Sequence, residues 1–223
     1  MTLLLVAHGT RKSGGVAMVG ALADEVSTLL DRQVEVAFVD VLGPTPRDAL
    51  GPSSILVPAF LARGYHVNVD IPAHVAASGH GETVITPPLG PSPQMVRALV
   101  DQLIENGWCR GDSVVLAAAG TSDRRALRDL HTAAAWLSAT IGSRVELAFA
   151  ATGRPRVGEA VTALRGRGAG RVVVASYLLS DGLFQDRLRD SGADLVTDPL
   201  GTHPATAQLV ANRFRRARVC GAA

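Results

Sequence analysis

Cysteine is nearly absent from this chain, which has only Cys109 and Cys220 among its 223 residues. Two cysteines are too few for a disulfide-rich scaffold, and Cys109 has no partner at the spacing of a zinc motif. No cysteine-rich tail is present to hold an iron–sulfur cluster. The chain therefore has to fold around a hydrophobic core, for which its 47% of hydrophobic residues provide the material.

Long apolar runs and one-signed charge clusters are also missing. No stretch approaches the roughly 20 apolar residues of a membrane helix, and Leu3–Ala7 is too short for a signal peptide. Charged residues make up 19% with a net charge of +2, and no basic run alternates with the aromatic residues, which make up only 4%. We therefore expect a cytoplasmic protein that binds neither membranes nor nucleic acids.

Short apolar segments alternate with helical patterns in the first half of the chain. The segments are Leu3–Val6, Val34–Val39, Ile55–Val57 and Thr83–Ile85. Apolar residues spaced three and four apart predict a helix from Val16 to Leu29 and another from Met95 to Leu103. Strands that alternate with helices are typical of an α/β domain with a parallel sheet.

The second half of the chain repeats the first. Matches at a distance of 111 residues are Gly9-Thr10 with Gly120-Thr121, Val34–Phe38 with Val145–Phe149, and Pro88-Leu89-Gly90 with Pro199-Leu200-Gly201. Between them, Ala59-Phe60-Leu61 matches Tyr177-Leu178-Leu179 at a distance of 118 residues, because the second copy is longer there. So many matches in the same order indicate a duplicated domain.

The repeat predicts two domains, 1–108 and 112–223, with a linker near Asn106–Asp112 where glycines interrupt the helical pattern. We expect each domain to be a four-stranded parallel sheet flanked by helices. Ligand groups of such sheets lie at the carboxyl ends of the strands. We therefore expect the active-site cleft between the two domains.

Three polar residues of the first repeat have no polar counterpart in the second. Ala119 stands at the position of His8, Ala151 at that of Asp40, and Phe184 at that of His66. Each of the three polar residues follows a predicted strand, whereas the neighbouring glycines and prolines occur in both repeats. A purely structural role would be needed twice, so we expect His8, Asp40 and His66 to form a site that only the first repeat retains.

Two imidazoles and a carboxylate suit a borderline divalent metal such as Fe²⁺, Co²⁺, Ni²⁺ or Zn²⁺. They leave coordination positions open, which transfer of a metal requires and a closed structural site lacks. Imidazole side chains in general exchange protons near neutral pH, so such residues could also accept protons from a ligand.

The sequence resembles the sirohydrochlorin chelatases along essentially its whole length. The resemblance rests on His8-Gly9-Thr10-Arg11, on Gly64-Tyr65-His66 followed by Asp70-Ile71-Pro72, and on the strand that ends at Asp40. It implies a class II tetrapyrrole chelatase in its long form, with two chelatase-like domains in one chain. It also implies that His8 and His66 bind the metal and that Asp40, where the family usually has glutamate, completes the catalytic set.

The implied reaction is the insertion of Fe²⁺ or Co²⁺ into a carboxylate-rich tetrapyrrole. The metal is a substrate, so no permanently bound cofactor is expected. Candidate substrate-binding residues are Gly9, Thr10, Arg11, Arg63, Gly120 and Thr121, whose amide and guanidinium groups favour anions. Lys12, Arg124 and Arg125 are further candidates. A self-contained monomer with pseudo-two-fold symmetry is expected.

Two other functions are compatible with parts of the sequence. A non-catalytic metal or tetrapyrrole carrier would use the same histidines without turnover. A histidine phosphatase also has a His-Gly after its first strand, but places an arginine before that histidine, where this chain has Ala7. The sequence does not decide between iron, which leads to sirohaem, and cobalt, which leads to cobalamin; we favour iron.

Overall fold

A computed structural model describes residues 1–220, the last two of them as backbone only. Residue contacts divide the chain into two compact units. The first combines Met1–Leu89 with the segment that begins at Gly201, and the second is Gly90–Leu200.

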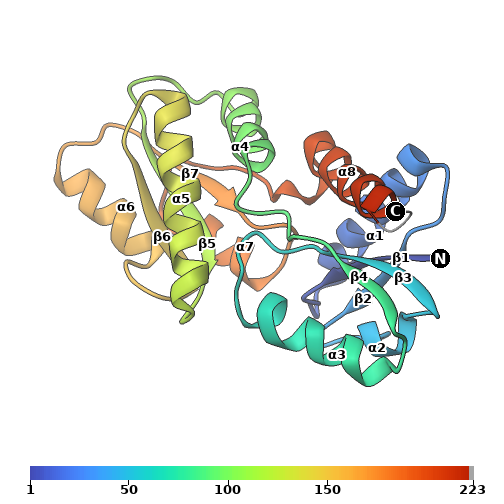
Figure 1. The fold of residues 1–223 in the computed structure, drawn as a ribbon. Coiled ribbons are helices and arrows are strands. Elements are labelled where there is room, and N and C mark those ends of the chain that lie inside the picture. Colours follow the sequence, from blue (N-terminus) through green and yellow to red (C-terminus); the bar gives the residue numbers. More distant parts are fainter. Residues whose placement is uncertain (221–223) are drawn as a thin grey trace. The chain divides into compact units, whose positions relative to one another are not determined.

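The first unit is a four-stranded parallel sheet with the strand order β2-β1-β3-β4. Its strands are β1 (Thr2–Ala7), β2 (Glu35–Phe38), β3 (Ser53–Pro58) and β4 (Glu82–Ile85). Its helices are α1 (Ser13–Leu30), α2 (Pro46–Ala49), the π-helical turn η1 (His66–Asp70), α3 (Ile71–Ser78) and α8 (Pro204–Cys220). Helices α1 and α8 cover one face of the sheet, and α2 and α3 cover the other (Figure 1).

The second unit has the same architecture, with the strand order β6-β5-β7-β8. Its strands are β5 (Ser113–Gly120), β6 (Val145–Thr152), β7 (Val172–Tyr177) and β8 (Leu195–Val196). Its helices are α4 (Pro93–Glu105), α5 (Arg124–Ile141), α6 (Val157–Gly166) and α7 (Leu183–Arg189). A short 3₁₀ turn, η2 (Leu200–Thr202), follows β8. The expected α/β class, with two parallel four-stranded sheets flanked by helices, is confirmed.

The two sheets share their pairing register as well as their strand order. Val6 pairs with Ala37 in the first sheet, and Ala117 pairs with Ala148 in the second, each 111 residues later. The loop after the second strand of each unit also repeats a hydrogen bond: the Phe38 amide donates to the Pro44 carbonyl, and the Phe149 amide donates to the Pro155 carbonyl. The repeat seen in the sequence is therefore a repeat of backbone geometry.

The compact units differ from the sequence repeats in their last helices. Helix α4 belongs to the first repeat but packs on α5 and β7 of the second unit, and α8 belongs to the second repeat but packs on α1 and β3 of the first unit. The chain leaves each unit at a Pro-Leu-Gly sequence, after Leu89 and after Leu200. The division at 1–108 and 112–223 thus remains a prediction about the sequence repeats. The residue contacts instead place α4 in the second unit and α8 in the first.

Leucines anchor both of these crossing points. The Leu89 amide donates to the Phe60 carbonyl at 3.0 Å, and the Leu200 amide donates to the Leu178 carbonyl at 2.7 Å. Both leucine side chains are fully buried. Burial of an apolar side chain beside a satisfied amide holds the chain firmly where it leaves the sheet.

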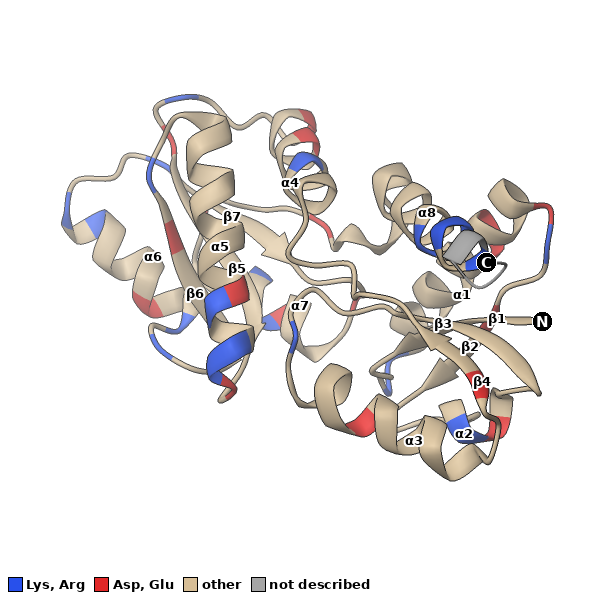
Figure 2. Cartoon of the chain, in the orientation of Figure 1, with Lys and Arg blue, Asp and Glu red and all other residues tan. Residues whose placement is uncertain are grey.

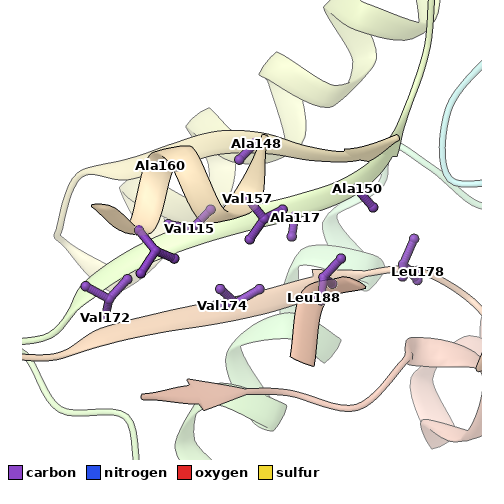
Figure 3. Packing of buried hydrophobic residues seen from close by; sticks show 11 residues of the cluster. Val115, Ala117, Ala148, Ala150, Val157, Ala160, Val172, Val174, Leu178 and Leu188 are labelled. Atoms are coloured by element: carbon purple, nitrogen blue, oxygen red, sulfur yellow. The ribbon is translucent and has the colours of Figure 1, made fainter. Parts of the chain in front are cut away.

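The core of the second unit illustrates why these strands are so apolar. Alternate residues of β5 and β7, such as Val115, Ala117, Val172 and Val174, face α6 and α7, where Leu188 packs against them (Figure 3). The intervening residues are also buried, because α4 and α5 cover the other face. A parallel sheet covered on both sides produces the continuous apolar runs that the sequence displays.

The described residues bear on the expectations about membrane-spanning helices and about the two cysteines. Among them, no helix has both the length and the apolar character needed to cross a membrane. Cys109 is an exposed free thiol, and the side chain of Cys220 lies outside the described residues.

Candidate functional site

Two histidines meet at the carboxyl ends of neighbouring strands in the first unit. His8 follows β1 directly, and His66 opens the turn η1 beyond the end of β3. Since β1 and β3 pair in parallel, their carboxyl ends lie at the same edge of the sheet. The ring centroids of His8 and His66 are 4.6 Å apart, with the rings nearly perpendicular at 79°. The structure therefore brings together the two imidazoles expected to form the site.

The Nδ1 atoms of both imidazoles are hydrogen-bonded within the protein. His8 Nδ1 lies 3.3 Å from the carbonyl oxygen of Gly9, and His66 Nδ1 lies 2.8 Å from Asp70 Oδ2. A carbonyl oxygen and a carboxylate only accept hydrogen bonds, so Nδ1 is the donor in each ring. In the neutral form each ring then carries its lone pair on Nε2, the form in which imidazole binds a metal.

Aromatic side chains border the His66 ring. Phe60 stacks on it with centroids 5.8 Å apart, and Tyr65 meets it edge-on at 5.7 Å. The Tyr65 side chain is 61% exposed, which is unusual for so large an apolar surface. These rings give the surface beside the imidazoles an apolar, flat character that suits a planar ligand.

The backbone of Asp40 lies beside that of His8, and its carboxylate has a local partner. The Asp40 amide donates to the His8 carbonyl at 3.0 Å, and Asp40 Oδ1 accepts a hydrogen bond from the Val41 amide at 2.8 Å. The Leu42 amide donates to the Asp40 carbonyl, which closes a tight turn around Val41 at φ +70°. A β-branched residue in that region is strained, and such strain is concentrated at functional sites. The carboxylate thus holds a strained turn beside His8.

The Gly-Thr pairs that occur in both repeats have a backbone explanation. Gly9 has φ +98° and Gly120 has φ +107°, and a Cβ at either position would collide with a carbonyl oxygen, that of Asp40 or that of Thr152. Thr10 Oγ1 accepts a hydrogen bond from the Lys12 amide, just as Thr121 Oγ1 accepts one from the Asp123 amide. The fold itself therefore requires Gly-Thr twice, and substrate binding by these residues stays a prediction.

The basic residues expected to bind substrate are exposed. Arg11, Arg63, Arg124 and Arg125 all have solvent-accessible side chains. Lys and Arg are spread over both units, with dense groups in the first turns of α5 and the last turns of α8 (Figure 2). On α8, Arg213 and Arg215 donate to the backbone carbonyls of Pro88 and Leu29, so their role is to hold the helix in place. The roles of Arg11 and Arg63 stay predictions.

In the second unit the equivalent positions carry no metal-binding atoms. Ala119 and Ala151 are partly buried, and the exposed Phe184 ring lies beneath the Arg187 guanidinium at 5.8 Å. The segment equivalent to η1 belongs to the ordinary helix α7. The chemical difference between the repeats is thus accompanied by a difference in backbone conformation.

The sequence analysis named Asp70 only as part of the family motif and assigned it no role. Its carboxylate binds His66, and its counterpart 118 residues later is Leu188, which is fully buried. The signal was present in the sequence, since a polar residue four positions after His66 is replaced by an apolar one in the second repeat.

The donor atoms at this edge form an open site. Among the side chains that the structure describes, those of residues 1–218, no three histidine, cysteine, aspartate or glutamate side chains form a group that could hold a metal ion. Two Nε2 atoms can hold a metal ion while its remaining positions stay available to water or to a second ligand. Such an arrangement suits a metal that is passed on.

Comparisons with known proteins find relatives of similar sequence and structures of the same fold. The chain is 24% identical over 236 residues to a sirohydrochlorin ferrochelatase of Priestia megaterium, covering 96% of this chain and 89% of the relative. A sirohydrochlorin cobaltochelatase of Methanothermobacter thermautotrophicus is 31% identical over 128 residues, or 45% of this chain and 89% of the relative. The structure of SirB from Bacillus subtilis with Fe3+ superimposes with a TM-score of 0.83 at 20% identity, covering 97% of this chain and 95% of that one.

The family comparison matches each repeat separately. The CbiX family model matches residues 2–106 and again residues 113–217, one match within each half of the chain. Together the two matches span most of the chain. The chain therefore belongs to the CbiX family and carries two copies of its domain.

Proposed function

We propose that this protein is a sirohydrochlorin chelatase, a lyase-class enzyme that inserts a divalent metal into the tetrapyrrole. The observation that carries the proposal is the pair of imidazoles 4.6 Å apart at one strand edge, each with its Nδ1 engaged. The names of the ferrochelatase and cobaltochelatase relatives support the same reaction.

In this proposal His8 and His66 first hold the metal and then accept protons. Insertion of M²⁺ requires the macrocycle to release two pyrrole N–H protons, while the metal leaves its protein ligands. Each Nε2 lone pair that the departing metal frees can accept one of these protons. Two imidazoles thus match the two protons of the reaction, and their position beside the ring supplies the proximity that lowers the barrier.

Asp40 and the surrounding surface complete the proposed site. In this proposal the carboxylate of Asp40, whose backbone amide is bonded to the His8 carbonyl, balances the charge of the metal. Phe60 and Tyr65 provide apolar surface for the macrocycle. Gly9, Thr10, Arg11, Arg63, Gly120 and Thr121 remain the candidates for its carboxylates.

We favour Fe²⁺ as the metal and sirohaem as the product, with Co²⁺ and cobalamin as the second choice. Imidazole nitrogen accepts both ions, and the general affinity order favours cobalt, so availability in the cell decides. The proposal includes a monomer, since one chain carries both repeats. It also includes a cytoplasmic location.

An anaerobic metalation assay tests the proposal. Sirohydrochlorin is mixed with Fe²⁺, Co²⁺ or Ni²⁺ in parallel, and the change in its absorbance gives the rate. We expect saturation with sirohydrochlorin, and a loss of about 100-fold or more in kcat for His8→Ala and for His66→Ala, because each removes a metal ligand and a proton acceptor. Asp40→Asn should lose less, since it leaves both imidazoles in place.

The control is His131→Ala, which changes an exposed histidine of α5 in the other unit and should keep the rate of the unaltered protein. Binding of metal or tetrapyrrole without saturable turnover would indicate a carrier instead. Equal rates in His8→Ala and the unaltered protein would contradict the proposed site.

A further inference from the structure

The turn that carries His66 differs in conformation from its counterpart in the second repeat. Residues His66–Asp70 form a π-helical turn, in which the Ile71 amide donates to the His66 carbonyl five residues earlier. The equivalent residues 184–188 lie in a regular α-helix. Single π turns are rare and are found mostly at functional sites. Only the repeat with the histidines has one here.

This turn brings the Asp70 carboxylate onto the His66 ring. Asp70 Oδ2 lies 2.8 Å from His66 Nδ1, and both side chains are about three-quarters buried, with exposures of 23% and 29%. Asp70 Oδ1 faces His74 Nε2 at 3.7 Å, one further turn along α3. The carboxylate therefore lies between two imidazoles, and each of its oxygens faces one of them.

A carboxylate at Nδ1 determines which nitrogen of His66 can bind a metal. The carboxylate accepts only, so the proton resides on Nδ1 and the lone pair on Nε2. Partners of this kind orient metal-binding histidines in many proteins and raise their basicity. The Gly9 carbonyl plays the equivalent part for His8, but at 3.3 Å and without charge.

The second repeat lacks both members of the pair. Phe184 stands in place of His66, and Leu188 in place of Asp70. Leu188 is fully buried in the apolar core of its unit, which shows that the fold accepts an apolar residue at this position. A carboxylate at Asp70 is thus not required by the architecture.

We propose that Asp70 is a positioning residue, which fixes the tautomer and orientation of His66 so that Nε2 is presented to the metal. This inference rests on the proposed function in that it takes His66 to be a metal ligand. The tautomer of the His66 ring can be measured without any turnover.

Three substitutions test the role. Asp70→Asn keeps the size but offers either an oxygen or an NH₂ group to Nδ1, so the tautomer is no longer determined. Asp70→Leu copies the second repeat and removes the acceptor. Asp70→Glu keeps a carboxylate one methylene further away. Asp24→Asn, at an exposed position of α1, is the control for loss of one negative charge.

The first measurement is the ring-nitrogen NMR spectrum of His66 at a pH where the imidazole is neutral. We expect the Nδ1–H tautomer in the unaltered protein and in Asp24→Asn, and a shift towards the Nε2–H tautomer in Asp70→Asn and Asp70→Leu. Asp70→Glu should restore much of the Nδ1–H form. An unchanged tautomer in both Asp70→Asn and Asp70→Leu would overturn the proposal.

The second measurement is binding of Co²⁺ alone, followed by its absorption spectrum, together with the two KM values of metalation. We expect the Kd for Co²⁺ and the KM for the metal to rise 10- to 100-fold in Asp70→Asn, with the KM for sirohydrochlorin within about twofold of its original value. A merely structural role would change both KM values together, and that result would also overturn the proposal.

The two proposals fail in different ways. If His66→Ala metalates at the normal rate while Asp70→Asn still shifts the tautomer, the proposed function fails and the positioning of the ring stands. If His66→Ala abolishes metalation while Asp70→Asn leaves both the tautomer and Co²⁺ binding unchanged, the function stands and the role of Asp70 is refuted.

Discussion

Some residues occur in both repeats because the backbone requires them, whereas others occur only in the first repeat, where they form the candidate site. Gly9 and Gly120 are kept because both adopt a positive φ where the backbone leaves no room for a Cβ. His8 and His66 are kept once, and they face each other across the end of the sheet. Comparing the repeats within one chain therefore yields information that usually requires many sequences.

Gly9→Ala tests the backbone requirement. We expect a loss of at least about 1–3 kcal/mol in the free energy of unfolding, because alanine at φ +98° is strained and its Cβ meets the Asp40 carbonyl. Gly20→Ala is the matched control, since that glycine lies inside α1 with no atom near a new Cβ. It should gain about 0.5–1 kcal/mol. Denaturant unfolding measures both, and similar values for the two variants would contradict the explanation.

Elements were predictable where the local pattern is strong. Each strand within residues 1–220 coincides with a short apolar run, and the apolar spacing from Val16 to Leu29 corresponds to α1 at Ser13–Leu30. The π-helical turn was not predictable, because its residues have no distinctive period and their counterparts form a regular helix.

The end of β7 provides a test at the level of one element. Burial, together with the nearby Asp129 carboxylate, raises the pKa of Tyr177 well above its ordinary value. The folded state therefore keeps the neutral phenol, while the unfolded chain ionises from about pH 10. We expect the free energy of unfolding to be unaffected by this group below that pH and to fall by up to about 1.4 kcal/mol per pH unit above it.

Tyr177→Phe should remove this part of the pH dependence, which denaturant unfolding between pH 8 and about pH 11 can measure. Tyr65→Phe is the control, because Tyr65 is exposed and its change should leave the slope as it is. If the free energy of unfolding falls equally steeply with pH in the Tyr177→Phe variant and in the unaltered protein, the Tyr177 phenol does not contribute to this pH dependence.

At the scale of the whole molecule, the exchange of α4 and α8 links the two repeats. Phe214 of α8 and Leu103 of α4 are both fully buried, each in the unit that consists mainly of the other repeat. The stability of each sheet therefore depends on a helix that belongs to the other repeat.

Native-state hydrogen exchange can show this dependence. Phe214→Ala should cost about 3–5 kcal/mol and lower the protection of amides in α1 and β3, against which its helix packs. Leu103→Ala should cost about 2–5 kcal/mol and lower protection in β5 and β7 instead. The two variants serve as each other's control, and the opposite pattern would mean that each helix stabilises its own repeat.

The general architecture of this protein and its candidate histidine pair could be predicted from the sequence by itself. The α/β class, the duplication and the pair His8 and His66 depend on local apolar patterns and on matching positions, which a chain displays without being folded. Only the tertiary structure decided which sheet each final helix covers, because the sheets are homologous and the apolar face of α4 or α8 would suit either one. It also decided the partner of His66, because the hydrogen bond from Nδ1 to Asp70 forms only when the folded chain places both side chains on the same helical turn.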